Sequence, residues 1–182
     1  MAGGMGMDAM LLDIGRFRSG VEHLERRYEA ADLIRKDDLF RIVSPVELVA
    51  DVRKDGAQVR VAGRVKATLE LECSRCLEPY AVPVDAAFDL LFLPAAEIDG
   101  EEEREVADED LGVSYYKNDV IDLGDVMREQ FYLALPMKPL CQPDCRGLCP
   151  ECGKNRNRES CSCQSEWVDP RLEPLRKLRK NV

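Results

Sequence analysis

Six of the eight cysteines crowd into one short stretch, from Cys141 to Cys163, with the sequence CQPDCRGLCPECGKNRNRESCSC. The other two, Cys73 and Cys76, form a separate pair in the segment CSRC. A chain of 182 residues with 45% hydrophobic content can bury an ordinary core without covalent cross-links. The crowding therefore needs its own explanation, and the candidates are disulfides, a redox centre and metal ions.

The last four cysteines have the spacing of a metal site. Cys149-Pro-Glu-Cys152 is followed by Gly153, and the two-residue gap lets both sulfurs and two backbone N–H groups face one ion. Glycine permits the tight turn that such a knuckle requires. Cys161 and Cys163 supply a second pair after a short loop. Four thiolates at about 2.3 Å from the ion would complete a closed, tetrahedral zinc site.

The other four cysteines allow more than one arrangement. Cys73 and Cys76 form a CxxC, and Cys141 and Cys145 form a CxxxC, so a second site requires these two segments to meet in space. The alternative is a single site in which the CSRC pair joins the CPEC pair. The sequence therefore predicts one or two structural Zn²⁺ ions, with free structural thiols as the plain alternative.

The cellular compartment expected from the sequence favours metal over disulfides. The N-terminal segment lacks the basic start and apolar run of a secretory signal, and it is not an Arg- and Ser-rich transit peptide. No stretch approaches the roughly 18 apolar residues that a membrane span requires. We therefore expect a cytoplasmic protein with no membrane partner, whose thiols stay reduced. A thioredoxin-like role is disfavoured because CSRC lies between two strand patterns rather than at the start of a helix.

Strict alternation of apolar and polar residues between positions 46 and 92 predicts half-buried antiparallel strands. Asp55 and Gly56 give a hairpin turn signal, and CSRC marks a second turn between strands. Earlier segments could add strands, although HLERRYEA fits a helix equally well. The apolar positions that share the expected faces are Val46, Leu48, Ala50, Val52, Val59, Val61, Val65, Ala67, Leu69, Leu71, Tyr80, Val82, Val84, Ala86, Phe88, Leu90 and Phe92.

Helical periodicity replaces alternation towards the C-terminus. In DLGDVMREQFYLALP, Asp122 is the expected N-cap and Pro136 the expected stop. The segment DPRLEPLRKLRK predicts a last, basic helix that opens at Asp169. One face of the first helix carries Leu123, Val126, Met127, Phe131 and Ala134. The predicted fold is α+β: a twisted antiparallel β-sheet domain that could close into a barrel, one amphipathic helix, a Cys-rich zinc knuckle and a short basic C-terminal helix.

Charge is distributed unevenly along the predicted parts. These parts are an antiparallel β-domain at 1–94, an acidic flexible loop at 95–112, and a helix plus Cys-rich zinc-binding tail and C-terminal helix at 113–182. Net charge is −9, but residues 95–110 alone hold nine acidic residues against one arginine, which predicts a solvated loop because like charges repel. From 136 to 182, ten Lys and Arg outnumber six Asp and Glu, so the acidic total does not exclude nucleic-acid binding.

Catalysis finds little support in the sequence. The single histidine, His23, is expected to be a surface or partly buried residue without a catalytic partner. A site closed by four thiolates leaves no open position for a catalytic water. The sequence also lacks the glycine spacing of a phosphate-binding loop. We therefore predict that the protein is not an enzyme and has no small-molecule substrate.

Basic residues carry the positive evidence for a partner. GKNRNRES places Lys154, Arg156 and Arg158 on the loop between the last two Cys pairs, where zinc-held loops often present such groups to phosphates. The ordinary alternative is a solvated loop. The candidate nucleic-acid contacts are Lys154, Arg156, Arg158, Arg176, Lys177, Arg179 and Lys180.

Four segments of the chain together resemble a known family. LECSRCLEPYAVPV, IDLGDVMREQFYLALPMKPLC, DCRGLCPECGKNRN and DPRLEPLRKL occur here in that order. They resemble the YceD family, the large ribosomal RNA subunit accumulation proteins of bacteria and chloroplasts. The resemblance covers about residues 45–93 and 119–180. Only the eight cysteines match motif positions with an arguable chemical role.

The resemblance implies a function rather than a set of RNA contacts. It implies a non-catalytic, cytoplasmic ribosome-biogenesis factor that promotes accumulation or processing of 23S rRNA and large-subunit assembly. The implied partner is pre-ribosomal RNA or a large-subunit ribosomal protein. The alternative is a zinc-stabilised protein-interaction adaptor without direct RNA contact. The assembly stage and the oligomeric state do not follow from the sequence.

Overall fold

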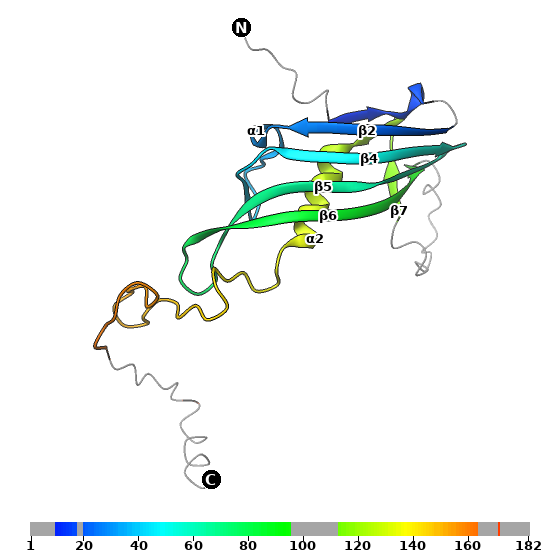
Figure 1. Ribbon diagram of the computed structural model, residues 1–182. Helices are drawn as coiled ribbons and strands as arrows, with labels where there is room; N and C mark the ends of the chain where they lie inside the picture. Colours follow the sequence, from blue (N-terminus) through cyan, green and yellow to red (C-terminus); the bar gives the residue numbers. More distant parts are fainter. Residues whose placement is uncertain (1–9, 18–19, 96–112, 164–170, 172–182) are drawn as a thin grey trace. The chain divides into compact units, whose positions relative to one another are not determined.

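The computed structural model describes residues 10–17, 20–95, 113–163 and 171 (Figure 1). Nearly all of the predicted acidic loop lies outside these residues, and so does the predicted basic C-terminal helix. Four of the candidate nucleic-acid contacts therefore stay sequence predictions, namely Arg176, Lys177, Arg179 and Lys180.

The chain divides into two compact units. One comprises Met1–Leu71 and Pro79–Pro139, and we call it the sheet unit. The other comprises Glu72–Glu78 and Leu140–Val182, and we call it the cysteine unit. The three predicted ranges divide the chain by sequence order, whereas these units divide it by contacts. The three ranges stay a prediction about domain organisation.

The main sheet of the sheet unit has the strand order β2-β4-β5-β6-β7, and a short β3 also pairs with β5. β4 is antiparallel to β5, as the hairpin signal predicted, and it is also antiparallel to β2. β7 runs parallel to β6, so the sheet is mixed at this edge. Among the described residues no ladder joins β2 to β7; the sheet is open and does not form the barrel considered above. The strands are β2 Gly20–Tyr28, β3 Arg41–Ile42, β4 Val46–Asp55, β5 Gln58–Glu72, β6 Pro79–Pro94 and β7 Val113–Tyr116.

The alternating pattern locates the core. Every apolar position predicted on β4 and β5 is buried, and on β6 Val84, Phe88 and Phe92 are buried while the remaining positions are half-buried. The expected hairpin turn connects β4 to β5, with Gly56 at φ 59°. Alternation thus predicted both the strands and the side of the sheet that faces the core.

The helix α2 (Leu123–Ala134) lies across one face of strands β2, β4, β5 and β6 in Figure 1. It begins at the predicted cap, since the Asp122 carboxylate accepts hydrogen bonds from the N–H groups of Gly124 and Asp125 at 2.8 and 3.3 Å. It ends before Pro136, as expected. The buried residues are Leu123, Gly124, Val126, Met127, Gln130 and Phe131. Ala134, which the periodicity placed on the same face, is exposed at the end of the helix. The Phe131 ring packs edge-on against Phe40, with ring centroids 5.9 Å apart.

Short elements complete the sheet unit. β1 (Leu11–Asp13) pairs antiparallel with β8 (Val120–Asp122), and the Leu123 N–H donates to the Met10 carbonyl at 2.9 Å, so this pair adjoins the start of α2. η1 (Ile14–Arg16) follows β1, and α1 (Ala30–Leu33) follows β2. Of the ambiguous segment HLERRYEA, His23 to Tyr28 belong to strand β2, and the last residue, Ala30, begins the short helix α1. No helix in the described part of the chain is long and apolar enough to cross a membrane.

Candidate metal centres

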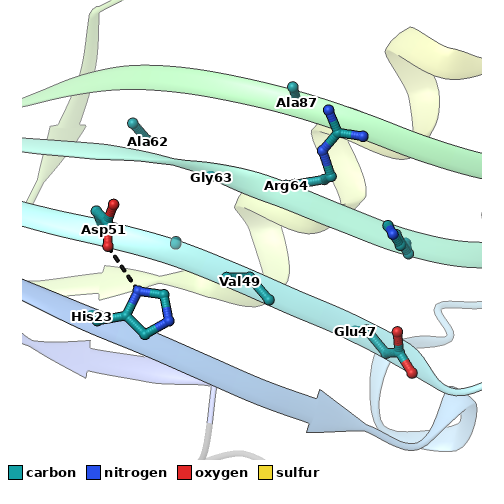
Figure 2. Close-up of a pocket in the computed structure, with 10 residues that line it drawn as sticks. His23, Glu47, Val49, Asp51, Ala62, Gly63, Arg64 and Ala87 are labelled. Carbon is teal, nitrogen blue, oxygen red and sulfur yellow. Dashed lines mark hydrogen bonds and ion pairs between the residues drawn. The ribbon is translucent and has the colours of Figure 1, made fainter.

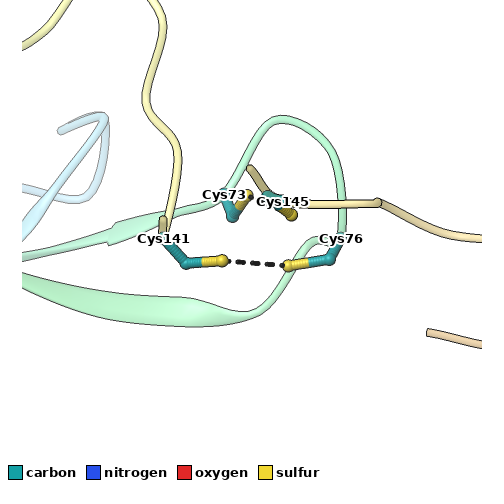
Figure 3. A group of neighbouring side chains, drawn as sticks. All are labelled: Cys73, Cys76, Cys141 and Cys145. Atoms are coloured by element: carbon teal, nitrogen blue, oxygen red, sulfur yellow. Dashed lines mark hydrogen bonds between the residues drawn. The ribbon is translucent and has the colours of Figure 1, made fainter. Parts of the chain in front are cut away.

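The first group of cysteines lies where the chain leaves β5, enters the cysteine unit and returns to β6. Cys73 and Cys76 come from this turn, and Cys141 and Cys145 come from the segment after α2 (Figure 3). All four sulfurs lie within 4.8 Å of one another. The Cys73 and Cys145 sulfurs are 3.7 Å apart, and those of Cys76 and Cys141 are 3.6 Å apart. We call this set the first cluster.

These distances discriminate between metal and disulfide. A disulfide requires sulfurs about 2.05 Å apart. Four thiolates about 2.3 Å from a central ion form a tetrahedron whose edges are about 3.8 Å. The measured separations of 3.6 and 3.7 Å match the tetrahedron edge, so the first cluster fits a tetrahedral ion. Three of its four cysteines are buried, which leaves little access for solvent.

The second cluster comprises the cysteines whose spacing predicted it, Cys149, Cys152, Cys161 and Cys163. Their sulfurs also lie within 4.8 Å of one another. Cys149 is buried, whereas Cys152 and Cys163 are exposed. The CSRC pair thus groups with Cys141 and Cys145 rather than with the CPEC pair, and the arrangement with one mixed site is not the one adopted.

The two CxxC segments form the same backbone turn. In the first, the Cys73 N–H donates to the Glu78 carbonyl at 2.9 Å, and the Leu77 N–H donates to the Cys73 carbonyl at 2.9 Å. In the second, the Cys149 N–H donates to the Lys154 carbonyl at 2.8 Å, and the Gly153 N–H donates to the Cys149 carbonyl at 2.9 Å.

The residue after each second cysteine has a positive φ, which is 60° for Leu77 and 73° for Gly153. Only the second turn carries the glycine that favours this conformation. The first turn holds leucine in a region that is strained for a residue with a Cβ. The first CxxC segment therefore adopts the same turn as the second, although it has leucine where the second has glycine.

Backbone hydrogen bonds stabilise one thiolate in the first cluster. Burial opposes a Cys73 thiolate, but N–H groups of Cys141, Cys76 and Arg75 outweigh it and lower the pKa of Cys73 to about 6. Burial, together with the neighbouring thiols, raises the pKa of Cys141 to about 12. A cation bound at the centre of the cluster would stabilise thiolates and so favour loss of the Cys141 proton.

The second cluster has the same electrostatic asymmetry. Backbone N–H groups of Cys152 and Glu151 lower the pKa of Cys149 to about 6. Hydrogen bonding to Cys152, with burial next, raises the pKa of Cys163 to about 12. In each cluster, backbone N–H groups thus favour the thiolate of the first CxxC cysteine, while the pKa of another cysteine is raised, and a bound cation would favour loss of that proton.

The two clusters are joined through the loop of the second. The Asn157 Nδ2–H donates to Sγ of Cys145 at 3.2 Å, while its Oδ1 accepts from the Arg146 N–H at 2.7 Å. The Arg156 N–H donates to the Gly147 carbonyl at 2.9 Å. Hydrogen bonds therefore connect the two clusters within residues 72–78 and 140–163 of the cysteine unit.

The basic loop residues do not share one environment. Lys154 Nζ lies 3.4 Å from Glu159 Oε2, and Arg158 Nη2 lies 3.0 Å from Glu78 Oε2. The Arg156 side chain is exposed and has no ion-pair partner among residues 10–17, 20–95, 113–163 and 171. The sequence gives no reason to distinguish Lys154, Arg156 and Arg158, but in the structure only Lys154 and Arg158 face a carboxylate among the described residues.

Sequence reasoning missed four residues around the clusters: Arg75, Arg146, Gly147 and Asn157. Each lies beside or between ligand cysteines in CSRC and in the stretch from Cys145 to Cys161. The available sequence signal was an arginine beside the cysteines of each segment, Arg75 within CSRC and Arg146 directly after Cys145. Arg75 contacts Cys145, 70 residues further along the chain, and sequence spacing does not reveal this contact.

The solvent-facing side of the main sheet carries an open groove of about 570 Å³ (Figure 2). His23 lies at its side, with Nδ1 2.8 Å from Asp51 Oδ1, and its side chain is 62% exposed. None of the described lining residues carries a hydroxyl or a thiol, so the groove offers no side-chain nucleophile of that kind. His23 is a surface residue, as the sequence indicated.

The described residues thus combine an open β-sheet with two groups of four cysteines, each of which could hold a metal ion. Residues 61–179 match the family described as "Large ribosomal RNA subunit accumulation protein YceD". This match covers well over half of the chain, and the chain belongs to the YceD family.

Relatives in bacteria and plants show the same kinship. An uncharacterised protein of Mycobacterium tuberculosis is 35% identical over 76% of this chain and 65% of its own length. A chloroplastic YCED homolog of Arabidopsis thaliana, named as a large ribosomal RNA subunit accumulation protein, is 27% identical over 76% of this chain and 50% of its own length. The uncharacterised protein YlbN of Bacillus subtilis is 24% identical over 86% of this chain and 90% of its own length.

The chain therefore spans less than two thirds of the mycobacterial and plant relatives. No solved structure matches the chain.

Proposed function

We propose that the protein is a non-catalytic, cytoplasmic ribosome-biogenesis factor that promotes the accumulation of 23S rRNA and the assembly of the large subunit. The support is membership of the YceD family together with a relative in Arabidopsis thaliana that is named for large ribosomal RNA subunit accumulation. In this proposal the sheet unit supplies the scaffold, and the cysteine unit presents the surface that meets pre-ribosomal RNA.

The observation that carries the proposal is the pair of four-cysteine clusters. We propose that each holds one Zn²⁺ through its own ligands, the first through Cys73, Cys76, Cys141 and Cys145, the second through Cys149, Cys152, Cys161 and Cys163. Four thiolates saturate a tetrahedral ion, so the ions would stabilise structure rather than activate water. The expected role is to fix a small, loop-rich unit that has little apolar core of its own.

Metal content is tested first, by native mass spectrometry of untagged protein purified without chelator. Two zinc ions per chain, lost on denaturation, would support both clusters. One ion would restrict the proposal to one cluster. No ion in protein whose eight thiols are all free would refute the zinc assignment.

The biological role is tested in cells whose own copy of the gene has been deleted. We expect the ratio of 23S to 16S rRNA and the share of complete large subunits to fall. The unaltered gene should restore both. A version with Cys73→Ser and Cys149→Ser should not. Unchanged rRNA ratios in the deletion strain would refute the proposed role, whereas full rescue by the cysteine variant would separate the role from the metal.

A further inference from the structure

The backbone at three arginines of the cysteine unit adjoins Gly147. Arg75 belongs to the first knuckle, and its carbonyl oxygen would lie 2.9 Å from a Cβ placed on Gly147. Arg146 directly precedes this glycine. Arg156 belongs to the loop of the second cluster, and its N–H donates to the Gly147 carbonyl. We call this set the arginine group.

The arginine group differs from its neighbours in having no carboxylate partner among the described residues. The Arg75 guanidinium donates to the Cys145 carbonyl at 2.7 Å, which leaves its charge uncompensated. The Arg146 and Arg156 side chains are exposed. In contrast, Lys154 and Arg158 face Glu159 and Glu78. These three cations without a carboxylate partner in the described part of the chain therefore belong to backbone segments that adjoin Gly147, between the two clusters.

The described contacts to sulfur do not use these side chains. The Cys145 sulfur accepts from the Asn157 amide, and the Cys73 and Cys149 sulfurs accept from backbone N–H groups. None of the described contacts joins a guanidinium of the arginine group to a cysteine sulfur, although Arg75 also donates to the Cys145 carbonyl. The exposed side chains of Arg146 and Arg156 are therefore open to a partner.

The surface fits a polyanion better than a protein partner. The cores of protein interfaces are depleted in charge and contain large apolar anchors. In the described part of the cysteine unit, Leu77 is the one large apolar side chain that is strongly exposed, at 60%. Guanidinium groups match phosphate oxygens through paired N–H donors.

We propose that Arg75, Arg146 and Arg156 form a phosphate-binding surface for single-stranded RNA at the seam of the two clusters. This inference rests on the proposed function and assigns its RNA contact to a set different from the loop cations expected from the sequence. Arg156 belongs to both sets, whereas Arg75 and Arg146 are new. The contact is to the RNA backbone, so it should not depend on base sequence.

The test compares two double variants that each remove two positive charges. Arg146→Gln with Arg156→Gln removes two members of the arginine group, and Lys154→Gln with Arg158→Gln removes the two paired cations. Arg75 is left intact because its guanidinium also holds the Cys145 carbonyl. The probe is a fluorescein-labelled single-stranded RNA of mixed sequence, titrated with metal-loaded, full-length protein at several salt concentrations.

A contact to one phosphate of a single strand adds about 0.7 to the slope of log affinity against log salt. The Arg146/Arg156 variant should therefore lower this slope by about 1.4 and weaken binding about 25-fold at 0.1 M salt. The Lys154/Arg158 variant should weaken binding less than about threefold. Metal content is measured on both variants, and both should retain the content of the unaltered protein.

Three outcomes would overturn the inference. If both variants weaken binding equally, the RNA contact stands but the arginine group is not its centre. If the Arg146/Arg156 variant loses metal, these arginines balance the charge of the clusters instead of binding RNA. If the unaltered protein shows no salt-dependent RNA binding and captures a large-subunit ribosomal protein instead, the proposed RNA contact itself fails.

Discussion

The side-chain amide of Asn157 donates a 3.2 Å hydrogen bond to Sγ of Cys145, so a residue from the loop of the second cluster supports a ligand of the first. The same side chain fixes the next peptide, because its Oδ1 accepts from the Arg146 N–H at 2.7 Å. Groups that hydrogen-bond to a metal ligand orient it, and their loss commonly weakens metal affinity.

Removing this side chain should weaken the first cluster selectively. For Asn157→Ala we expect metal affinity there to fall about 10- to 100-fold, the usual cost of losing such a partner. Alkylation of individual cysteines during a chelator challenge, read by mass spectrometry, distinguishes the clusters. Cys73 and Cys145 should lose protection before Cys149. Ser160→Ala, an exposed change in the same loop, is the control and should behave as the unaltered protein. Equal loss at both clusters would contradict a selective role.

Gly147 should tolerate a side chain less well than Gly153, although both have a positive φ, of 69° and 73°. A Cβ on Gly147 would meet the Arg75 carbonyl oxygen at 2.9 Å, whereas a Cβ on Gly153 meets nothing within 4 Å. Gly153→Ala should thus cost only backbone strain, about 1 kcal/mol. Gly147→Ala should cost more, because it also separates the two knuckles. Thermal unfolding of the metal-loaded proteins measures both, and equal shifts in Tm would show that steric contact with Arg75 is unimportant.

Metal affinity of the first cluster should depend steeply on pH. In the metal-free protein Cys76 and Cys141 have raised pKa values, about 12 for Cys141, so both keep their protons between pH 6.5 and 8. Binding releases these two protons, so affinity should fall at least about 100-fold for each unit of acidification. Below the Cys73 pKa of about 6 a further proton competes and the slope should increase. Competition with a chromophoric chelator measures the slope, and an affinity independent of pH would exclude thiolate ligation.

The core of the sheet unit depends on the face of α2 that carries Phe131. This side chain is 1% exposed and packs against Phe40. Phe131→Ala should lower the free energy of unfolding by about 3–5 kcal/mol, through lost burial and the cavity that remains. Leu133→Ala, on the same helix but 73% exposed, should change it by less than about 0.5 kcal/mol. Urea unfolding followed by far-UV circular dichroism compares them, and similar losses would contradict the assigned buried face.

The sequence predicted those parts of the fold that local periodicity determines. Alternation on β4 and β5 identified the buried positions because each strand has one face on the core. The cap at Asp122 was predictable because its carboxylate serves N–H groups within three residues. β7 was not predicted: its four residues carry no periodic signal, and its parallel partner β6 lies beyond the acidic run.

The sequence likewise predicted only those parts of the candidate site that lie within one short segment. The second cluster follows from spacing, because all four of its cysteines lie within one short segment. The first cluster joins segments far apart in the sequence, so the grouping of Cys73 and Cys76 stayed open until the fold was known. The separate environments of Lys154, Arg156 and Arg158 also depend on this grouping, since Glu78, the partner of Arg158, lies beside the first knuckle.

Cys76 and Cys141 are 65 residues apart in the chain, although their sulfurs are only 3.6 Å apart. An ion held by both would close the intervening chain, including β6, β7, β8 and α2, into a covalently continuous ring. A cross-link around a loop of this length lowers the entropy of the unfolded chain by the equivalent of about 4 kcal/mol. A molecule nicked once inside the ring would remain a single particle, and its two pieces would separate only after the sulfurs had released their ion.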